Sequence, residues 1–375
     1  MNAIRPFTLD IPEADLAHLA ARLDRTRWPE AATVDDWTQG TPLAALGELV
    51  AYWRTGYDWR RCEARLNAVG QFVTEIDGLD IHFLHKPSSR SDAVPLLLTH
   101  GWPGSVVEFL GVIDELTEPT VADTQAFHVI APSLPGYGFS AKPGATGWGV
   151  ERIAQAWTEL MQRLEYRRWM AQGGDWGAAV TMAIGQLAPS ECRGIHLNMP
   201  IGRPGPDDMQ SKDLKVLKAL QRLGFYQEWD SGYSKQQSTR PQTIGYGLVD
   251  SPSALAAWML EKVHYWTDNQ GSAWDVLTMD QVLDDVMLYW LPATGASAAR
   301  LYWESFGKFG EGTVSIPAGA SAFPGEILPA PREWVERTLT NLVYWNDLDK
   351  GGHFAAWEQP KLFVSELRAC VAAMP

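Results

Sequence analysis

The stretch Gly173-Gly174-Asp175-Trp176-Gly177 decides how this chain folds. It follows the short apolar run Trp169–Gln172, which is typical of a buried strand, and it opens a helical pattern over residues 176–187. Glycines on both sides of an aspartate indicate a crowded turn between a strand and a helix. The alternative is an ordinary turn in which Asp175 only caps the helix, and the surrounding sequence has to distinguish the two.

Short apolar runs alternate with helical patterns on both sides of this turn. Strands are predicted over residues 95–99, 127–131, 169–172 and 194–197. Helices are predicted between them, notably over residues 150–165 and 176–187. Apolar strands that alternate with helices predict an α/β fold, with a mostly parallel central sheet and helices on both faces.

Segments that do not show this alternation of strands and helices flank and interrupt the core. Helices are expected over Pro12–Leu23 and Leu43–Trp53, and residues 71–85 predict a β-hairpin around the turn Asp77-Gly78. From about residue 204 to 297 the sequence is helical and rich in Trp and Tyr, which predicts a lid inserted into the core. The sheet is expected to resume over residues 314–318 and 342–346, before a last helix over 359–372.

These patterns predict four segments along the chain. Residues 1–70 form an N-terminal helical arm, and residues 71–203 form the first part of the core. Residues 204–298 form the helical lid, and residues 299–375 complete the core.

The composition limits the partners and the location. A net charge of −14 over 375 residues repels phosphate backbones, so we expect no nucleic-acid partner. Cys62, Cys192 and Cys370 lie far apart, match no zinc spacing and are expected to be free thiols. No apolar run approaches the roughly 18 residues of a membrane helix, and the charged N-terminus is unlike a signal peptide. We therefore expect a cytoplasmic protein.

An aspartate at this turn indicates a particular chemistry. In the α/β-hydrolase fold the turn carries the nucleophile, usually a serine, but this chain has no Gly-x-Ser-x-Gly. A carboxylate that attacks a saturated carbon forms an alkyl ester whose acyl carbon belongs to the enzyme, and water can then release the alcohol. Epoxides and alkyl halides react at such carbons, so Asp175 is the candidate nucleophile.

The segment His100-Gly101-Trp102-Pro103-Gly104-Ser105 follows a predicted strand, where this fold places its oxyanion loop. The expected backbone donors are the N–H groups of Trp102 and Trp176. Pro103 lacks an N–H, and we predict that the Trp102–Pro103 peptide is cis. His100 is an alternative base, although a histidine at a strand end can simply hold a loop.

His353 is the better candidate for the base, because it lies on a glycine-containing loop after the last predicted strand. The order nucleophile, acid, histidine is that of the α/β-hydrolases. The acid should lie between the lid and this loop. We prefer Glu326, which follows the next-to-last predicted strand, and Asp347 is the runner-up from position. The other candidates are Glu333, Glu336 and Asp349.

Taken together, these motifs resemble the microsomal-type epoxide hydrolases, whose α/β-hydrolase fold bears an N-terminal epoxide hydrolase domain. The resemblance runs from about residue 5 to residue 368. It rests on the arm over residues 5–30, the segments 100–104 and 132–140, the turn 173–177, and the segments 322–326 and 351–356.

The resemblance implies roles for individual residues. Asp175 is similar to the family nucleophile, Glu326 to the charge-relay acid and His353 to the base that activates water. Tyr233 and Tyr302 are similar to the two family tyrosines that hydrogen-bond the epoxide oxygen. The pattern of the residues alone does not single out these two tyrosines among eleven.

The resemblance also implies the reaction. An apolar or aromatic epoxide would become a vicinal diol through an ester on Asp175, with water as the second substrate and without metal or organic cofactor. The chain begins directly with the arm rather than with the anchor helix of membrane-bound members, so we expect no stable membrane insertion. A homodimer built on the arm is possible. The rival functions are a haloalkane dehalogenase and an inactive hydrolase-fold protein that binds an apolar ligand.

Overall fold

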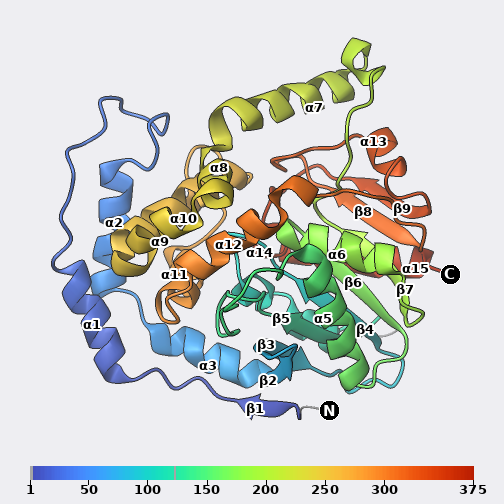
Figure 1. Cartoon of the computed structure of the whole chain (residues 1–375), viewed down its shortest axis with the longest axis horizontal. Helices are drawn as coiled ribbons and strands as arrows, with labels where there is room; N and C mark the ends of the chain where they lie inside the picture. The colour runs from blue at the N-terminus through green and yellow to red at the C-terminus, as the bar shows by residue number, and fades with distance from the viewer. Residues whose placement is uncertain (1–2, 122–123) are drawn as a thin grey trace.

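The computed structural model describes residues 3–121 and 124–375, so the first two residues of the predicted arm lie outside it. A nine-stranded sheet in the described residues forms the centre of the molecule, in the order β1-β2-β3-β5-β4-β6-β7-β8-β9 (Figure 1). The neighbours from β1 to β5 pair antiparallel, and those from β5 to β9 pair parallel. The strands are β1 (Arg5–Phe7), β2 (Gln71–Ile76), β3 (Leu79–Lys86), β4 (Val94–Thr99), β5 (Phe127–Pro132), β6 (Trp169–Gly173), β7 (Cys192–Leu197), β8 (Ala318–Ala322) and β9 (Leu342–Asp347).

Helices cover this sheet as the alternating pattern predicts. In Figure 1 the helices α5 (Val150–Arg163) and α6 (Trp176–Leu187) pack together in front of the sheet, and α6 contacts β4, β6 and β7. The last helix, α15 (Pro360–Ala373), contacts β8 and β9. Short helices α4 (Ile113–Thr117), α13 (Arg332–Glu336) and α14 (Ala355–Glu358) lie in the connections. The predicted α/β-hydrolase fold is therefore confirmed.

The predicted hairpin and four predicted core strands are present. β2 and β3 pair antiparallel from Gln71↔Leu84 to Ile76↔Leu79. Asp77 and Gly78 between them have φ angles of 51° and 76°, as a two-residue turn with both central residues left-handed requires. β4, β5, β6 and β7 each contain the stretch predicted for them.

The strand predicted over residues 314–318 is wrong in position. The structure places β8 at Ala318–Ala322, and Val314 forms only an isolated bridge with Leu339. Pro317 cannot donate a ladder hydrogen bond, so the regular strand begins after it. The sequence Ala-Gly-Ala-Ser-Ala has no branched or aromatic residue to mark a strand. Small residues are required there because a Cβ on Gly319 would lie 2.3 Å from Cys370 Sγ on α15.

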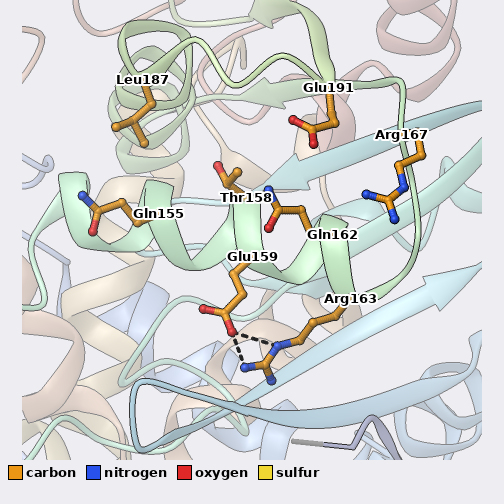
Figure 2. Close-up of a pocket in the computed structure, with 8 residues that line it drawn as sticks. All are labelled: Gln155, Thr158, Glu159, Gln162, Arg163, Arg167, Leu187 and Glu191. Atoms are coloured by element: carbon orange, nitrogen blue, oxygen red, sulfur yellow. Dashed lines mark hydrogen bonds and ion pairs between the residues drawn. The ribbon is translucent and has the colours of Figure 1, made fainter. Parts of the chain in front are cut away.

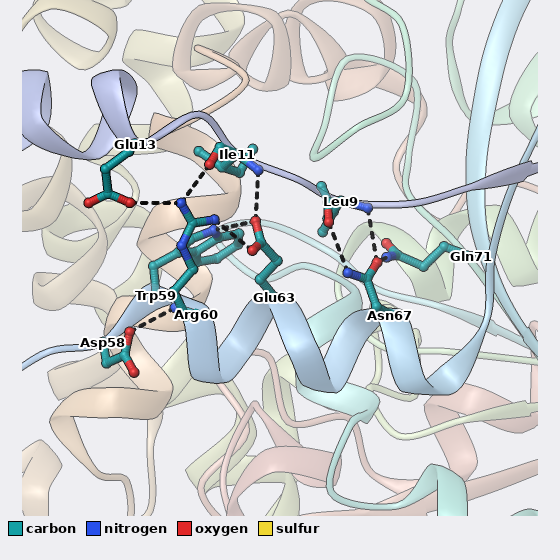
Figure 3. Close-up of polar contacts among 9 residues, drawn as sticks. All are labelled: Leu9, Ile11, Glu13, Asp58, Trp59, Arg60, Glu63, Asn67 and Gln71. Atoms are coloured by element: carbon teal, nitrogen blue, oxygen red, sulfur yellow. Dashed lines mark hydrogen bonds and ion pairs between the residues drawn. The ribbon is translucent and has the colours of Figure 1, made fainter.

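The N-terminal arm contains α1 (Glu13–Leu23) and α2 (Leu43–Thr55), as predicted, and also α3 (Trp59–Val69), which was missed. Figure 3 shows how α3 holds the extended segment that follows β1. The backbone N–H of Ile11 donates to Glu63 Oε2 at 2.8 Å, and that of Leu9 donates to Asn67 Oδ1 at 2.9 Å. The segment between β1 and α1 thus runs along α3, which pairs two of its backbone N–H groups.

The lid follows β7 and lies beside the carboxyl ends of the parallel strands. Its helices are α7 (Leu214–Phe225), α8 (Gly232–Thr239), α9 (Pro241–Asp250), α10 (Pro252–Trp266), α11 (Met279–Trp290) and α12 (Gly295–Ser305). A π-helical turn over Tyr226–Asp230 joins α7 to α8. In Figure 1, α7 extends away from the other lid helices at the top of the view.

Two other sequence expectations can be compared with the structure. Cys62, Cys192 and Cys370 are all buried free thiols. Within residues 3–121 and 124–375, no helix is both long and apolar enough to cross a membrane.

Candidate active site

Asp175 lies at the sharp turn between β6 and α6. Its φ of 53° and ψ of −129° are strained for a residue with a side chain, and its side chain makes no capping hydrogen bond to α6. A Cβ on Gly173 would lie 2.0 Å from the Gly177 carbonyl oxygen, and one on Gly177 would lie 1.9 Å from that of Thr99. The capping alternative is therefore wrong. The flanking glycines are required by the close approach of β4, β6 and α6.

The loop after β4 supplies a donor to the carboxylate. The Trp102 N–H donates to Asp175 Oδ1 at 2.7 Å, and the Trp102–Pro103 peptide is cis, as predicted. Trp176 begins α6 directly after Asp175. Its N–H stays a predicted second donor.

His100 holds this loop in place. The Leu134 N–H donates to His100 Nε2 at 3.2 Å, and His100 Nδ1 lies 2.9 Å from the Gly101 carbonyl oxygen. Burial lowers the pKa of His100 to about 4, so the ring is neutral. Both ring nitrogens are occupied by backbone groups, which fits a structural role rather than the alternative role of base.

His353 and Glu326 lie together behind Asp175. His353 Nδ1 lies 2.7 Å from Glu326 Oε1, and His353 Nε2 lies 3.4 Å from Asp175 Oδ2. Burial alone would lower the pKa of His353, but the charges of Glu326 and Asp175 outweigh it and raise that pKa well above its ordinary value. The imidazole is thus protonated in the free enzyme.

The other candidate acids do not reach His353. Asp347 is exposed and pairs with Lys215 at 2.9 Å, and Glu336 pairs with Arg332 at 2.7 Å. Glu333 and Asp349 are exposed. Among the five candidates, the structure brings only Glu326 to the histidine.

The lid brings two tyrosines over the nucleophile. Tyr233 on α8 stacks on Trp102 with 4.9 Å between ring centroids, and Tyr302 on α12 packs edge-on against Trp176 at 4.8 Å. The two tyrosine rings are 5.8 Å apart. Burial, with the neighbouring tyrosines and Asp175, raises the pKa of both phenols well above the ordinary value, so both remain protonated donors.

The hydroxyl groups of these tyrosines differ in their partners. Tyr302 Oη is buried, and no protein hydrogen-bond partner for it lies in the described part of the chain. Tyr233 Oη lies 3.2 Å from Tyr226 Oη. A buried hydroxyl that lacks a partner among the described residues, and whose pKa is raised by the charge of Asp175, is suited to bind a substrate oxygen.

Glu358 is a residue of this site that the sequence analysis did not identify. Its Oε2 accepts from the N–H groups of Asp268 at 2.7 Å and Gly352 at 3.0 Å, and its Oε1 accepts from Phe354 N–H at 2.9 Å. These bonds hold the loop on both sides of His353. In the sequence, the position of Glu358 five residues after His353 is the feature from which its place in the site could have been inferred.

A further hollow lies away from this site. It is an open groove of about 720 Å³ along α5, shown in Figure 2, and polar or charged side chains dominate its lining. Glu159 and Arg163 in this groove pair with each other, with Nε at 3.0 Å from Oε1. None of the predicted site residues lines this groove, so the groove is not the candidate active site.

Comparisons with known proteins place the chain in a family. Residues 4–109 match the family described as epoxide hydrolase N terminus, and residues 94–231 match the alpha/beta hydrolase fold. Epoxide hydrolase 1 of Sus scrofa is 34% identical over 98% of this chain and 88% of its own length. This chain belongs to the epoxide hydrolases. A putative epoxide hydrolase of Stigmatella aurantiaca is 53% identical over 98% of this chain and 84% of its own length.

Solved structures of other epoxide hydrolases share the whole architecture. The epoxide hydrolase of Aspergillus niger superposes with a TM-score of 0.91 and 34% identity, covering 100% of this chain and 97% of that one. The juvenile hormone epoxide hydrolase of the silkworm Bombyx mori superposes with a TM-score of 0.90 and 31% identity, covering 99% and 95%. The arm, core and lid of this chain are therefore those of an epoxide hydrolase.

Proposed function

We propose that this epoxide hydrolase opens an apolar or aromatic epoxide through a covalent ester on Asp175. One observation carries the proposal. The Asp175 carboxylate is fixed on a strained turn, with Oδ1 held by the Trp102 N–H at 2.7 Å and Oδ2 facing the His353–Glu326 pair at 3.4 Å. A carboxylate held in this way is positioned as a nucleophile, with a base behind it to complete the turnover.

In the first step, Tyr233 and Tyr302 donate hydrogen bonds to the epoxide oxygen and stabilise the charge that develops as the C–O bond breaks. Asp175 attacks a ring carbon from the opposite side. A hydroxyalkyl ester forms as the ring C–O bond breaks, and the alkoxide oxygen takes the proton of one of the two phenols, which regains a proton from solvent. Both phenols are protonated at neutral pH because burial raises their pKa, so both are able to donate.

In the second step, His353 removes a proton from water, and the resulting hydroxide attacks the Asp175 carbonyl carbon. The oxyanion lies against the Trp102 N–H and the predicted Trp176 N–H. Esterification removes the Asp175 charge, which is one of the causes that raise the pKa of His353. The imidazolium therefore releases its proton to solvent more readily once the ester has formed, and the neutral ring can then accept a proton from water.

The substrate class follows from the hollow next to the lid. A hollow of about 420 Å³ is lined mainly by apolar side chains, which are Met199, Ile201, Leu223, Phe309, Leu328 and Trp334. Phe309, one of the lining residues, contacts Trp176 edge-on at 5.1 Å, and we infer that a group on the substrate extends past this ring into the hollow. A bulky apolar or aromatic group on the epoxide fits such a lining. A cytoplasmic location and a homodimer stay predictions.

The test is intact-mass spectrometry of His353→Gln mixed with styrene oxide. The variant keeps the nucleophile and the tyrosines but lacks the base, so the ester should accumulate as a single adduct. Asp175→Asn should form no adduct, and His18→Gln, which is exposed on α1, should turn over like wild type. The absence of an adduct in His353→Gln would contradict the covalent scheme. Chloride release from a haloalkane, measured in parallel, should be absent.

A further inference from the structure

A small cavity adjoins the nucleophile and the base. Its volume is about 20 Å³, enough for roughly one water molecule. Asp175, His353, Asn198 and Glu108 contribute polar side chains to it, whereas Tyr233 is absent from its lining. The apolar side chains that close it are those of Phe109, Phe354, Ala355, Ala356 and Phe363. The cavity is thus distinct from the place where the lid tyrosines meet an epoxide.

Glu108 reaches this cavity because of a neighbouring glycine. It lies in the 3-10 turn Val106–Phe109, which follows the oxyanion loop. A Cβ on Gly104 would lie 1.5 Å from Glu108 Oε1, so only glycine leaves room for the carboxyl group there. Glu108 is half-buried as a whole residue, and it is one of the residues that line the cavity.

The surroundings favour the neutral form of this carboxyl group. Burial raises the pKa of Glu108 well above its ordinary value, and the charges of Asp285 and Asp175 add to this effect while that of His353 opposes it. A neutral carboxyl group has one oxygen that accepts and one hydroxyl that donates. It can therefore hold a water molecule without adding a third negative charge beside Asp175.

Building on the covalent mechanism proposed above, we infer that Glu108 is a positioning residue that holds the hydrolytic water against His353. The water would donate one hydrogen to His353 Nε2 and the other to a Glu108 oxygen. Asn198 supplies a further donor, because its Oδ1 is already taken by Gln172 Nε2 at 2.6 Å while its Nδ2 is left for the cavity. A water molecule bound by three such groups is oriented rather than merely enclosed.

The step that Glu108 serves is hydrolysis of the ester. The water oxygen forms a bond to Asp175 Cγ, and His353 Nε2 takes its proton. The bond between Cγ and the diol oxygen then breaks, and that oxygen receives the proton from His353. Glu108 lines the cavity and not the place where the tyrosines meet the epoxide. A change at Glu108 should therefore slow hydrolysis of the ester and leave formation of the ester unchanged.

The experiment is single-turnover kinetics with styrene oxide, followed by tryptophan fluorescence and by intact mass after acid quenching. In Glu108→Leu, hydrolysis of the ester should slow by at least about tenfold, because a misplaced water loses its alignment with His353. Ester formation should stay within about threefold of wild type, so kcat and KM fall together. Glu108→Gln keeps an acceptor and a donor, and should hydrolyse the ester within about threefold of wild type.

Two further variants sharpen the comparison. Gly104→Ala displaces the Glu108 carboxyl group without changing it, and should reproduce the slow hydrolysis of Glu108→Leu. If Glu108→Leu fails to fold, Gly104→Ala still tests whether the Glu108 carboxyl group positions the water. Glu115→Leu alters a nearby glutamate that pairs with Arg368 at 3.0 Å and does not line the cavity, so both steps should be unchanged.

Three results would overturn the inference: normal hydrolysis in Glu108→Leu, equal slowing of both steps, or a Glu108→Gln variant as slow as Glu108→Leu. His353→Gln, run alongside, separates this inference from the mechanism. An ester that accumulates in His353→Gln, together with normal hydrolysis in Glu108→Leu, contradicts the role of Glu108 alone. No ester in either His353→Gln or wild type contradicts the covalent mechanism itself.

Discussion

At the scale of single residues, His353 and Asp175 are coupled through charge. The two carboxylates near His353 raise its pKa well above the ordinary value of 6.5, against the effect of burial. The folded state therefore binds this proton more tightly than the unfolded chain. The stability that the charged ring contributes is fully present below the unfolded pKa and is lost as the pH rises through the folded pKa.

We predict that removing either carboxylate lowers the pKa of His353. Asp175→Asn and Glu326→Gln each remove a negative charge that favours the imidazolium, so the imidazole should titrate at lower pH in both variants. NMR titration of the histidine side chains measures this directly. Glu336→Gln, on the surface, is the control and should leave the titration unchanged. A pKa of His353 that is the same in Asp175→Asn as in wild type would contradict the coupling.

The same coupling predicts a difference between two kinetic pH profiles. In the ester the Asp175 charge is absent, so the pKa of His353 should be lower in the intermediate than in the free enzyme. The acid limb of kcat, under conditions where hydrolysis limits the rate, should therefore fall below the pKa that NMR gives for free His353. Coincidence of the two values would mean that esterification leaves the environment of the ring unchanged.

The tyrosines allow a second residue-scale prediction. Tyr302→Phe removes the hydroxyl for which the described residues provide no hydrogen-bond partner, and it should slow ester formation by about 10²-fold, as loss of one preorganised donor does. Tyr233→Phe should act on the same step. Stopped-flow fluorescence with styrene oxide measures it, with Tyr246→Phe, an exposed lid tyrosine, as the control. Slow hydrolysis with normal ester formation would contradict the proposed role of both tyrosines.

Sequence reasoning found the residues that a motif marks and missed those that the fold brings in from elsewhere. Asp175 and His353 stand out because glycines surround them on recognisable loops. Glu326 was preferred from its place after a strand, although the strand itself was placed wrongly. The tyrosines came only from resemblance to a family, because an amphipathic lid helix gives no sign of which ring faces the nucleophile. Glu108 and Glu358 were missed because ordinary glutamates carry no such sign.

At the scale of elements, the turn between β6 and α6 depends on how closely α6 approaches β4. A Cβ on Gly177 would lie 1.9 Å from a backbone oxygen, and backbone cannot rotate away as a side chain can. The helix can therefore begin directly after Asp175 only if residue 177 is a glycine. The position of the nucleophile is thus determined by packing between two elements as well as by the turn itself.

We predict that Gly177→Ala lowers the free energy of unfolding by at least about 2 kcal/mol, because overpacking forces a backbone shift. It should also lower the rate of ester formation, since Asp175 would move with α6. Gly224→Ala on α7 has no neighbour within 4 Å and should be neutral or stabilise by up to about 1 kcal/mol. Urea unfolding measures both. An unchanged midpoint for Gly177→Ala would show that α6 accommodates the methyl group.

Elements with a strong local pattern were predicted well, and the others failed for identifiable reasons. The helix predicted over residues 176–187 and the hairpin have clear periodicity and turn residues, and the structure contains both. β8 is made of small residues, which its packing against α15 requires and which resemble a loop in the sequence. α3 was missed although Asp58 caps it and Trp59, Cys62 and Leu66 share one buried face.

At the scale of the whole molecule, the N-terminal arm braces the lid. Tyr57 Oη donates to Asp284 Oδ1 at 2.8 Å, and Arg61 Nη2 lies 2.6 Å from the same oxygen. Tyr52 Oη donates to Asp280 on the same lid helix, α11, at 2.9 Å. The arm therefore has a physical role beside the core, because it holds α11, the lid helix that contacts α10. We propose the four-segment division of the chain on this basis, with the lid extended from residue 298 to the end of α12 at Ser305, because the predicted boundary falls inside that helix.

We predict that Tyr57→Phe loosens α11 without changing the chemistry. Loss of one hydrogen bond to a buried carboxylate should cost about 1–2 kcal/mol. Hydrogen exchange should accelerate in α11, while the rate of ester formation stays close to that of wild type. Tyr246→Phe again serves as the control. Exchange in α11 that is unchanged by Tyr57→Phe would contradict the bracing role of the arm.

The central claim is that Asp175 attacks the epoxide and that water attacks only the resulting ester. Its most direct test is a single turnover of styrene oxide by excess wild-type enzyme in water labelled with oxygen-18. The covalent scheme predicts an unlabelled diol, because its new oxygen comes from Asp175, and a labelled peptide that contains Asp175. A labelled diol with an unlabelled enzyme would mean that water attacks the epoxide directly, and would contradict the account.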